Sequence, residues 1–211
     1  MPLGTQEQKI FLQIAYGKLR MKAKEGDAKA VWREFEGKGS WAVEYSWIEG
    51  QIKKIYYKES KEYGNSYEVT IDDGENLYNV SFKENSRYCQ DFLVKLPNID
   101  LSQPVKITPY DMRSEDGKER RGTSVMQNGI KLKSYFSQKE GDVWIYREGF
   151  PEPKKPKLTD KEWKIYLIEI QSFLMDYVKD NIIPKLNDPA VKLGISEETS
   201  SHEDDSNDLP F

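Results

Sequence analysis

The sequence predicts a mainly β fold that ends in one long α-helix, on three observations. Between residues 31 and 146, short segments in which apolar and polar residues alternate are separated by turn residues, as in half-buried strands. Within this region, residues 86–96 change to helical spacing. Residues 159–187 carry an apolar stripe at helical spacing after a Pro- and Lys-rich stretch.

The N-terminal segments predict strands that precede the main sheet. Residues 9–22 mix apolar and polar positions around Gly17 and are interpreted as a strand or a hairpin. Residues 31–36 and 41–47 alternate as half-buried strands do. Residues 48–58 follow as one long strand, in which Gly50 favours a bend or a bulge.

The following segments complete the predicted sheet. Residues 67–71 and 77–82 alternate around an Asp-Gly turn, and the helix at residues 86–96 ends at Pro97. A strand resumes at residues 105–108. The dipeptide Asn128-Gly129 is the strongest hairpin signal in the chain. It joins predicted strands at residues 123–127 and 130–136, and residues 143–146 form one more strand.

A long bent first strand, two further strands, a helix and two more strands are typical of an OB-type fold, a partly open five-stranded Greek-key barrel. Residues 1–149 are therefore predicted to form this barrel, with extra N-terminal strands, elongated hairpins and a short helix between strands 3 and 4. Residues 150–158 are interpreted as an extended linker. A capping-box sequence at Thr159 begins the amphipathic helix of residues 159–187, which Pro184 is expected to end.

The apolar stripe of that helix must be buried, either on the barrel or in a homo-oligomer. Residues 194–211 are predicted to be disordered, because they have too little apolar surface to form a core. They also hold the chain's net acidity. All 32 Lys and Arg residues, but only 30 of the 36 Asp and Glu residues, precede residue 194.

The composition excludes several classes of protein. No run approaches ~18 apolar residues, and the N-terminus is polar, so neither a membrane span nor a signal peptide is expected. Cys89 is the single cysteine, which excludes an internal disulfide and fits a reducing, cytoplasmic environment.

Catalysis is not expected. The single histidine, His202, lies in the acidic tail, so the folded part has no histidine base. Cys89 falls on the apolar helix face, as a core thiol does. There is no phosphate-binding glycine loop and no zinc-type spacing, and we expect neither cofactor nor metal. Asp72, Asp73 and Asp111 could serve a metal-dependent nuclease, although Asp73-Gly74 is more typical of a β-turn.

Binding to single-stranded nucleic acid has better support, because cations neutralise phosphates and aromatic rings stack on bases. Basic and aromatic residues are interleaved on the predicted first strand and on the later hairpins. The candidate residues are Lys53, Lys54, Tyr56, Tyr57, Tyr110, Arg113, Arg120, Arg121, Lys131, Lys133 and Tyr135. Taken singly, each could instead belong to the core or to a solvated face.

The extreme C-terminus is a candidate protein ligand. Its acidic run closes on an apolar Leu-Pro-Phe at the free carboxylate, which could fill a pocket while the acids meet Arg or Lys. The candidate partner-binding residues are Asp204, Asp205, Asp208, Leu209, Pro210 and Phe211.

This ending resembles the acidic tip of bacterial and phage single-stranded DNA-binding proteins. Residues 48–136 are similar to phage proteins of that family with an OB fold, in the runs at residues 67–74 and 92–105, at Arg120-Arg121-Gly122 and at residues 131–135. The resemblance implies a protein that coats single-stranded DNA with little sequence preference in replication, recombination or repair. It also implies that the tip recruits replication or recombination proteins, within the bacterial cytoplasm if the chain is phage-encoded.

Two other interpretations stay open. A non-nucleic-acid OB-type module could bind an oligosaccharide or a protein through the same aromatics, and the nuclease is the less favoured one. By charge complementarity, the acidic tail could also occupy the basic groove when DNA is absent.

Overall fold

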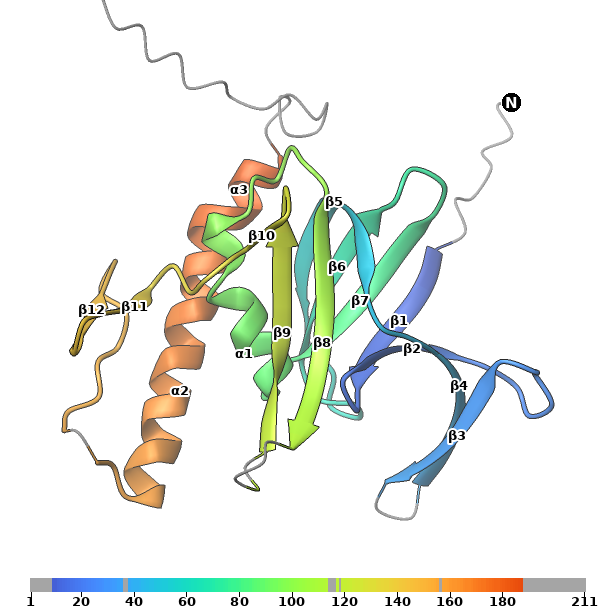
Figure 1. The fold of residues 1–211 in the computed structure, drawn as a ribbon, viewed down its shortest axis with the longest axis horizontal. Coiled ribbons are helices and arrows are strands. Elements are labelled where there is room, and N and C mark those ends of the chain that lie inside the picture. Colours follow the sequence, from blue (N-terminus) through green and yellow to red (C-terminus); the bar gives the residue numbers. More distant parts are fainter. Residues whose placement is uncertain (1–8, 36–37, 114–116, 118, 156, 188–211) are drawn as a thin grey trace, which may run out of the picture.

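The structure is a computed structural model, which describes residues 9–35, 38–113, 117, 119–155 and 157–187 (Figure 1). The strands are β1 Lys9–Ala15, β2 Lys18–Lys22, β3 Ala30–Phe35, β4 Lys38–Tyr45, β5 Ile48–Lys58, β6 Ser66–Asp72, β7 Leu77–Lys83, β8 Val105–Arg113, β9 Glu119–Gln127, β10 Ile130–Lys131, β11 Ser137–Glu140 and β12 Val143–Tyr146. The helices are α1 Arg87–Leu93, a 3-10 turn Leu96–Asn98, α2 Asp160–Tyr177, a π-helical turn Val178–Ile182 and α3 Ile183–Leu186.

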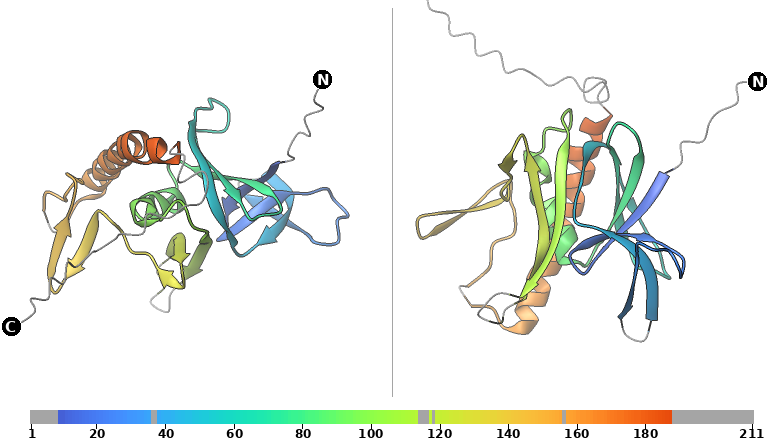
Figure 2. Two further views of the ribbon diagram at one scale, coloured as in Figure 1. Left: turned by 90° about the horizontal axis from the view of Figure 1, so that it is seen from above. Right: turned by 45° about the vertical axis from the view of Figure 1, so that its right-hand side comes forward.

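One large open sheet dominates the molecule, in the order β10-β9-β8-β5-β6-β7-β1-β2-β4-β3, and β11 and β12 form a separate hairpin. Every neighbouring pair is antiparallel except β1 and β7, which run parallel. The prediction of a mainly β fold with a C-terminal helix is confirmed. Figure 2 shows α2 and the β3–β4 hairpin at opposite ends of the molecule.

The predicted OB-type barrel is not confirmed. Its five strands correspond to β5–β9, which lie in the row β9-β8-β5-β6-β7. A closed barrel needs β7 to pair with β9, and within the described ranges no ladder joins them. Instead β7 pairs with β1, and α1 packs along β9. The N-terminal strands therefore extend the sheet where closure was expected.

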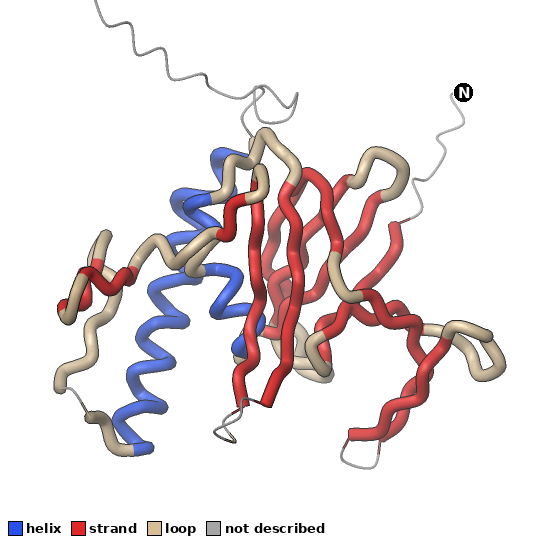
Figure 3. Tube along the Cα trace, in the orientation of Figure 1, coloured by secondary structure: helices blue, strands red, loops and turns tan. Residues whose placement is uncertain are grey.

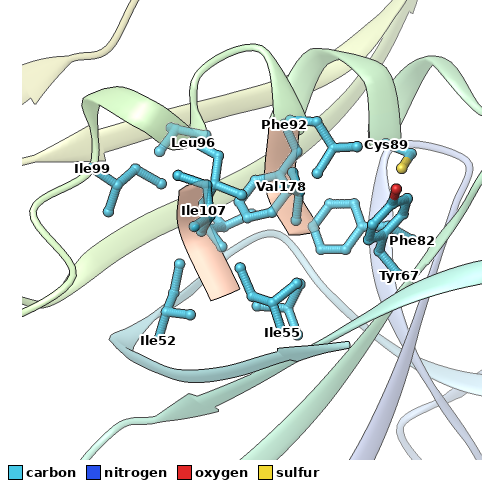
Figure 4. Packing of buried hydrophobic residues seen from close by; sticks show 14 of the residues in the cluster. Ile52, Ile55, Tyr67, Phe82, Cys89, Phe92, Leu96, Ile99, Ile107 and Val178 are labelled. Carbon is cyan, nitrogen blue, oxygen red and sulfur yellow. The ribbon is translucent and has the colours of Figure 1, made fainter. Parts of the chain in front are cut away.

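The core lies between the sheet and the helices. Phe82 of β7 stacks on Phe92 of α1, with ring centroids 4.5 Å apart. Figure 4 shows these rings with Ile55, Ile107 and Val178, which come from the sheet and from the C-terminal helical segment. Figure 3 shows the helices gathered beside β8 and β9, while the sheet continues away from them toward β3 and β4.

The C-terminal helical segment packs on the chain's own core. Its side chains at Ile170, Leu174, Val178, Ile182 and Leu186 are buried at a spacing of four residues. The chain itself therefore covers this part of the apolar stripe. A homo-oligomer through this helix stays a prediction.

Pro184 does not end the helix where the sequence predicted. The Ile183 N–H donates to the carbonyl of Val178, five residues back, in a π-helical turn. A wide turn at this point accommodates a proline that has no N–H and would crowd an α-helical turn. The helix therefore continues through α3 to Leu186.

Aromatic rings attach the segment after β10 to α2. Phe136 is fully buried and stacks on Phe150, with centroids 5.3 Å apart, and meets Tyr177 edge-on at 4.7 Å. The predicted strand at residues 130–136 is therefore wrong beyond Lys131, because the chain leaves the sheet to reach this cluster. The linker begins here too, and Pro151 O accepts a hydrogen bond from Tyr166 (3.1 Å).

The β1–β2 hairpin is held against β8. Its two-residue turn has positive φ at Tyr16 (55°) and Gly17 (67°). The Gly17 N–H donates to the Tyr88 hydroxyl at 2.9 Å. A Cβ on Gly17 would lie 2.5 Å from the backbone N of Asp111. Only glycine permits this approach, which brings the N-terminal hairpin beside the β8–β9 pair.

Candidate nucleic-acid interface

The predicted DNA-binding residues do not form one cluster. Three of them, Lys53, Lys54 and Tyr56, lie on β5, as does Tyr57. Three arginines lie at the β8–β9 tip, and two lysines lie on or just after β10. The remaining residues are tyrosines that make packing or hydrogen-bond contacts within the protein, namely Tyr57, Tyr110 and Tyr135.

The arginines at the β8–β9 tip are largely neutralised. Arg121 binds Asp111 at 3.0 Å and Glu119 at 3.1 Å, and Arg113 meets Glu119 at 3.5 Å. The hydrogen bond to Asp111 raises the pKa of Arg121. Arg120 pairs with none of the carboxylates in the described ranges. The tip therefore offers phosphates less positive charge than its sequence suggests.

The residues after Asn128-Gly129 are separated from that tip. The predicted turn is confirmed, with φ of 51° and 76° at its two residues. Lys131 pairs with Met126. Met126 is six residues from Arg120 along β9, a distance of about 20 Å. Lys133 follows the end of β10 and is exposed. The structure therefore places Lys131 and Lys133 apart from the arginines of the β8–β9 tip.

Tyr135 and Tyr110 are engaged within the protein. The Tyr135 ring packs edge-on against Phe136 at 5.1 Å, and its N–H donates to Val94 O. Tyr110 is half-buried, and its hydroxyl donates to Asp91 at 3.4 Å. Burial, and then the Asp91 charge, raise the pKa of Tyr110.

A bulge in β5 divides the residues predicted on that strand. The pairing with β6 shifts between Ile52 and Lys54, and the Lys53 ammonium in the bulge lies 4.0 Å from Asp72. After the bulge, Lys54 and Tyr56 point outward, whereas Tyr57 lies on the inner face.

The Tyr57 hydroxyl is fixed by two hydrogen bonds. It donates to Glu84 at 2.8 Å and accepts from Asn65 at 2.8 Å. Burial and then the Glu84 contact raise the pKa of Tyr57 to about 12. Its hydroxyl is therefore engaged inside the protein.

The outer face of four neighbouring strands forms the best candidate interface. The register places Tyr56, Glu68, Ser81 and Gln13 in one row across β5, β6, β7 and β1. The next row contains Lys54, Thr70, Asn79 and Phe11. Because side chains alternate along each strand, their neighbours two positions away share the same face. The Phe11 face is the set Lys9, Phe11, Gln13, Lys54, Tyr56, Lys58, Ser66, Glu68, Thr70, Asn79, Ser81 and Lys83.

Small polar side chains form the floor of the Phe11 face. Glu68 is only 5% exposed, and its carboxylate accepts hydrogen bonds from Ser66 (2.8 Å), Asn79 (2.6 Å) and Ser81 (2.8 Å). These three donors offset the loss of water around the carboxylate. Glu68 and its three donors are therefore held together in the floor.

Exposed lysines, the exposed Phe11 ring and the half-buried Tyr56 ring rise from this floor. Phe11 is 65% exposed, an unusual position for a phenylalanine. The Lys54 ammonium lies 5.3 Å from the Tyr56 ring centroid. The other lysines of the face are exposed, and across the described ranges none of them pairs with a carboxylate; they are Lys9, Lys58 and Lys83. β5 and β1 are three strand spacings apart, about 14 Å, so the rings of Tyr56 and Phe11 are separate platforms.

Sequence reasoning missed Phe11, and it also missed Trp47. The Trp47 ring is half exposed, and the Lys106 ammonium lies 4.0 Å from its centroid. The alternation of residues 9–15, with Leu12 inward and Phe11 outward, was a signal that could have identified the exposed phenylalanine. For Trp47 no local signal existed, because Lys106 lies on a different strand.

The other predicted sites stand apart from this face. Asp73 Oδ1 accepts the backbone N–H groups of Glu75 and Asn76, as in a β-turn, and Asp111 is bound to Arg121. Across the described ranges no three His, Cys, Asp or Glu side chains are grouped to hold a metal ion.

The predicted partner-binding tip and the expected lack of a membrane span are the remaining sequence predictions. The six partner-binding residues predicted between Asp204 and Phe211 lie outside the described residues. In the part of the chain that is described, no helix has the length and apolarity needed to cross a membrane.

Comparison with known proteins gives no relative. No protein-family model matches the chain, and neither does any curated protein or any solved structure.

Proposed function

We propose that the protein binds single-stranded DNA with little sequence preference and coats it during replication, recombination or repair. The observation that carries the proposal is the Phe11 face, where the exposed Phe11 ring and the half-buried Tyr56 ring lie among lysines above a polar floor. Lysines can neutralise phosphates, and a ring can stack on any base without reading its sequence. The acidic C-terminal tip would recruit replication or recombination proteins.

The strand arrangement supports an OB-type origin for this face. The row β9-β8-β5-β6-β7, with α1 between β7 and β8, has the strand order of an OB barrel opened between its two outer strands. On this interpretation β1 fills the opening and contributes Phe11 to the sheet surface that OB folds use for oligonucleotides. The N-terminal elaboration would then be part of the binding surface.

The first test removes the stacking ring. Phe11→Ala should weaken binding to labelled oligo-dT by about 1–3 kcal/mol. It should leave the thermal midpoint unchanged, because the ring is mostly exposed. Trp144→Ala is the matched control, since Trp144 is also exposed but lies on the separate β11–β12 hairpin. Equal losses for both variants, or none for Phe11→Ala, would contradict the proposal.

The second arm of the test measures the salt dependence. Affinity should fall steeply with ionic strength. In a plot of the logarithm of the binding constant against the logarithm of the salt concentration, the slope should become shallower by about 0.7 when one phosphate contact is lost. Lys58→Ala should reduce the slope, and Lys154→Ala, on the exposed segment before α2, should not. Binding that ignores salt would instead favour an uncharged ligand such as an oligosaccharide. Cleavage of labelled DNA with Mg²⁺ or Mn²⁺ would favour a nuclease.

A further inference from the structure

A cavity of about 390 Å³ lies between α1 and α2, away from the Phe11 face. Its walls are largely apolar and include Cys89, Leu93, Leu167 and Leu174. Its size is within the range of pockets that bind small ligands or peptide side chains. Cys89 is almost fully buried, and burial raises its thiol pKa, so this thiol is part of the wall and not a nucleophile.

Two cations border this apolar cavity. Arg87 at the start of α1 and Lys164 in the first half of α2 both line it and are both exposed. In the described ranges neither forms an ion pair with a carboxylate. The one acidic residue in the lining, Glu84, accepts a hydrogen bond from Tyr57. The cavity therefore combines an apolar interior with free positive charge at its border.

The apolar surface continues beyond the cavity onto α2. Ile168, which lines the cavity, is 65% exposed, and Trp163, one turn before the lining residue Leu167, is 41% exposed. The Tyr67 hydroxyl, which belongs to another lining residue, is buried and has no hydrogen-bond partner among the described residues. An exposed apolar area next to a pocket with an unsatisfied polar group indicates a site for a ligand.

The chain carries a segment whose chemistry matches this site. Residues 203–211 close on Leu209-Pro210-Phe211, after four acidic residues and no basic one. We propose that the cavity between α1 and α2 binds this C-terminal segment of the same chain. The Leu-Pro-Phe side chains occupy the apolar part, and the carboxylates face Arg87 and Lys164.

The length of the chain after α3 suits this contact. The cavity residues of α2 lie roughly 20–35 Å back along the helix from Asn187, at 1.5 Å per residue. The ~24 residues that follow would have a root-mean-square span of about 27 Å as a flexible coil. Because span and distance agree, the tethered segment has a high effective concentration at the cavity. While bound there, the tip is withheld from other proteins.

A photo-crosslink in the 211-residue protein tests the site directly and does not depend on DNA binding. Phe211 is replaced by p-benzoylphenylalanine, the DNA-free protein is irradiated, and the crosslinked peptides are identified by mass spectrometry. We expect crosslinks within one chain to residues 85–93 or 164–174. Crosslinks to β5 or β1 on the Phe11 face, crosslinks between two chains, or no crosslink would each overturn the proposal.

A charge reversal then tests the role of the border. Lys164→Glu should lower the crosslink yield about fivefold, since it replaces an attraction by a repulsion. Lys161→Glu is the matched control, because Lys161 lies on the same helix, is exposed and does not line the cavity. An unchanged yield for Lys164→Glu, or equal losses for both variants, would overturn the assignment of the acidic groups to this border.

Discussion

Phe11 and Tyr57 show how the surroundings of a ring decide what it can do. Phe11 is mostly exposed, so its ring adds little to the core. Tyr57 lies three strands away on the opposite face, packs against Tyr67 with ring centroids 5.2 Å apart and donates to Glu84. An aromatic residue can stack on a base only when its face is accessible. We therefore assign a stability role to Tyr57.

The Tyr57 hydroxyl provides a prediction with a pH dependence. Its folded pKa, about 12, is above the unfolded value near 10, so its contribution is complete below pH ~10 and is lost as pH rises through 12. Tyr57→Phe should lower the free energy of unfolding by about 1 kcal/mol at pH 7. Urea denaturation measures this loss of stability, and oligo-dT titration measures DNA affinity, which should not change. Weaker DNA binding by the folded variant would contradict the stability role.

The bulge in β5 explains why the sequence named Lys54, Tyr56 and Tyr57 as candidates without separating the outward side chains from the inward one. Strict alternation would place Lys53, Ile55 and Tyr57 on the face opposite to Ile52. The extra residue between Ile52 and Lys54 instead brings Ile52, Ile55 and Tyr57 to the inner face. Gly50 indicated an irregularity, but no neighbouring residue determined where along the strand it falls.

At the scale of elements, the β1–β2 turn packs against β8 and so connects the N-terminal strands to the β8–β9 pair. It combines a left-handed backbone at Gly17, a hydrogen bond to Tyr88 and close approach to Asp111. The turn lies beside the end of β8 at which Asp111 binds Arg121. Its geometry therefore determines how the N-terminal strands meet the β8–β9 hairpin.

Two glycine substitutions separate the cost of a side chain at positive φ from the cost of a steric clash with β8. Gly17→Ala and Gly74→Ala each place a side chain at positive φ, 67° and 93°, which costs about 1 kcal/mol. A Cβ on Gly74 meets nothing within 4 Å, whereas one on Gly17 meets backbone atoms of β8. Gly17→Ala should therefore lower the free energy of unfolding by about 1–3 kcal/mol more than Gly74→Ala does, as measured by urea denaturation. Equal costs would show that the turn is not closely packed.

Elements with strong local signals were predicted well. The β5 bounds, the Asn128-Gly129 turn and the Thr159 capping box all follow from residues close in the sequence. The open sheet was not predicted, because the choice between β9 and β1 as the partner of β7 depends on contacts distant in the sequence. The end of β10 was missed for a similar reason. Phe136 packs against rings on α2 that follow it by some 40 residues.

At the scale of the whole molecule, charge is divided between the sheet and the tail. The lysines of the Phe11 face lie in a region with a slight basic excess, and the six acids after residue 194 reverse the sign of the total. Long-range attraction between the tail and the Phe11 face would weaken the proposed DNA binding at low salt. Binding of the tip in the cavity between α1 and α2 would not by itself block the Phe11 face.

The division of charge between sheet and tail predicts the effect of removing the tip. A chain that ends at residue 202 should bind oligo-dT as tightly as the 211-residue protein or more tightly, because four carboxylates are removed. It should lose the capture of replication or recombination proteins. Anisotropy titrations at two salt concentrations and pull-downs with purified partners measure these outcomes. A large loss of DNA affinity would refute the assignment of the tail to protein contacts.

The parallel pairing of β1 with β7 has a consequence for synthesis on the ribosome. Lys9 at the start of β1 pairs with Leu77, so this strand emerges well before its partner is made. At about 5–20 residues per second, the delay lasts roughly 3–14 seconds. During that interval Phe11 and Leu12 have no β7 to join and are potential substrates for chaperones. β1 can pair early with β2, but its other edge stays open until β7 has been made.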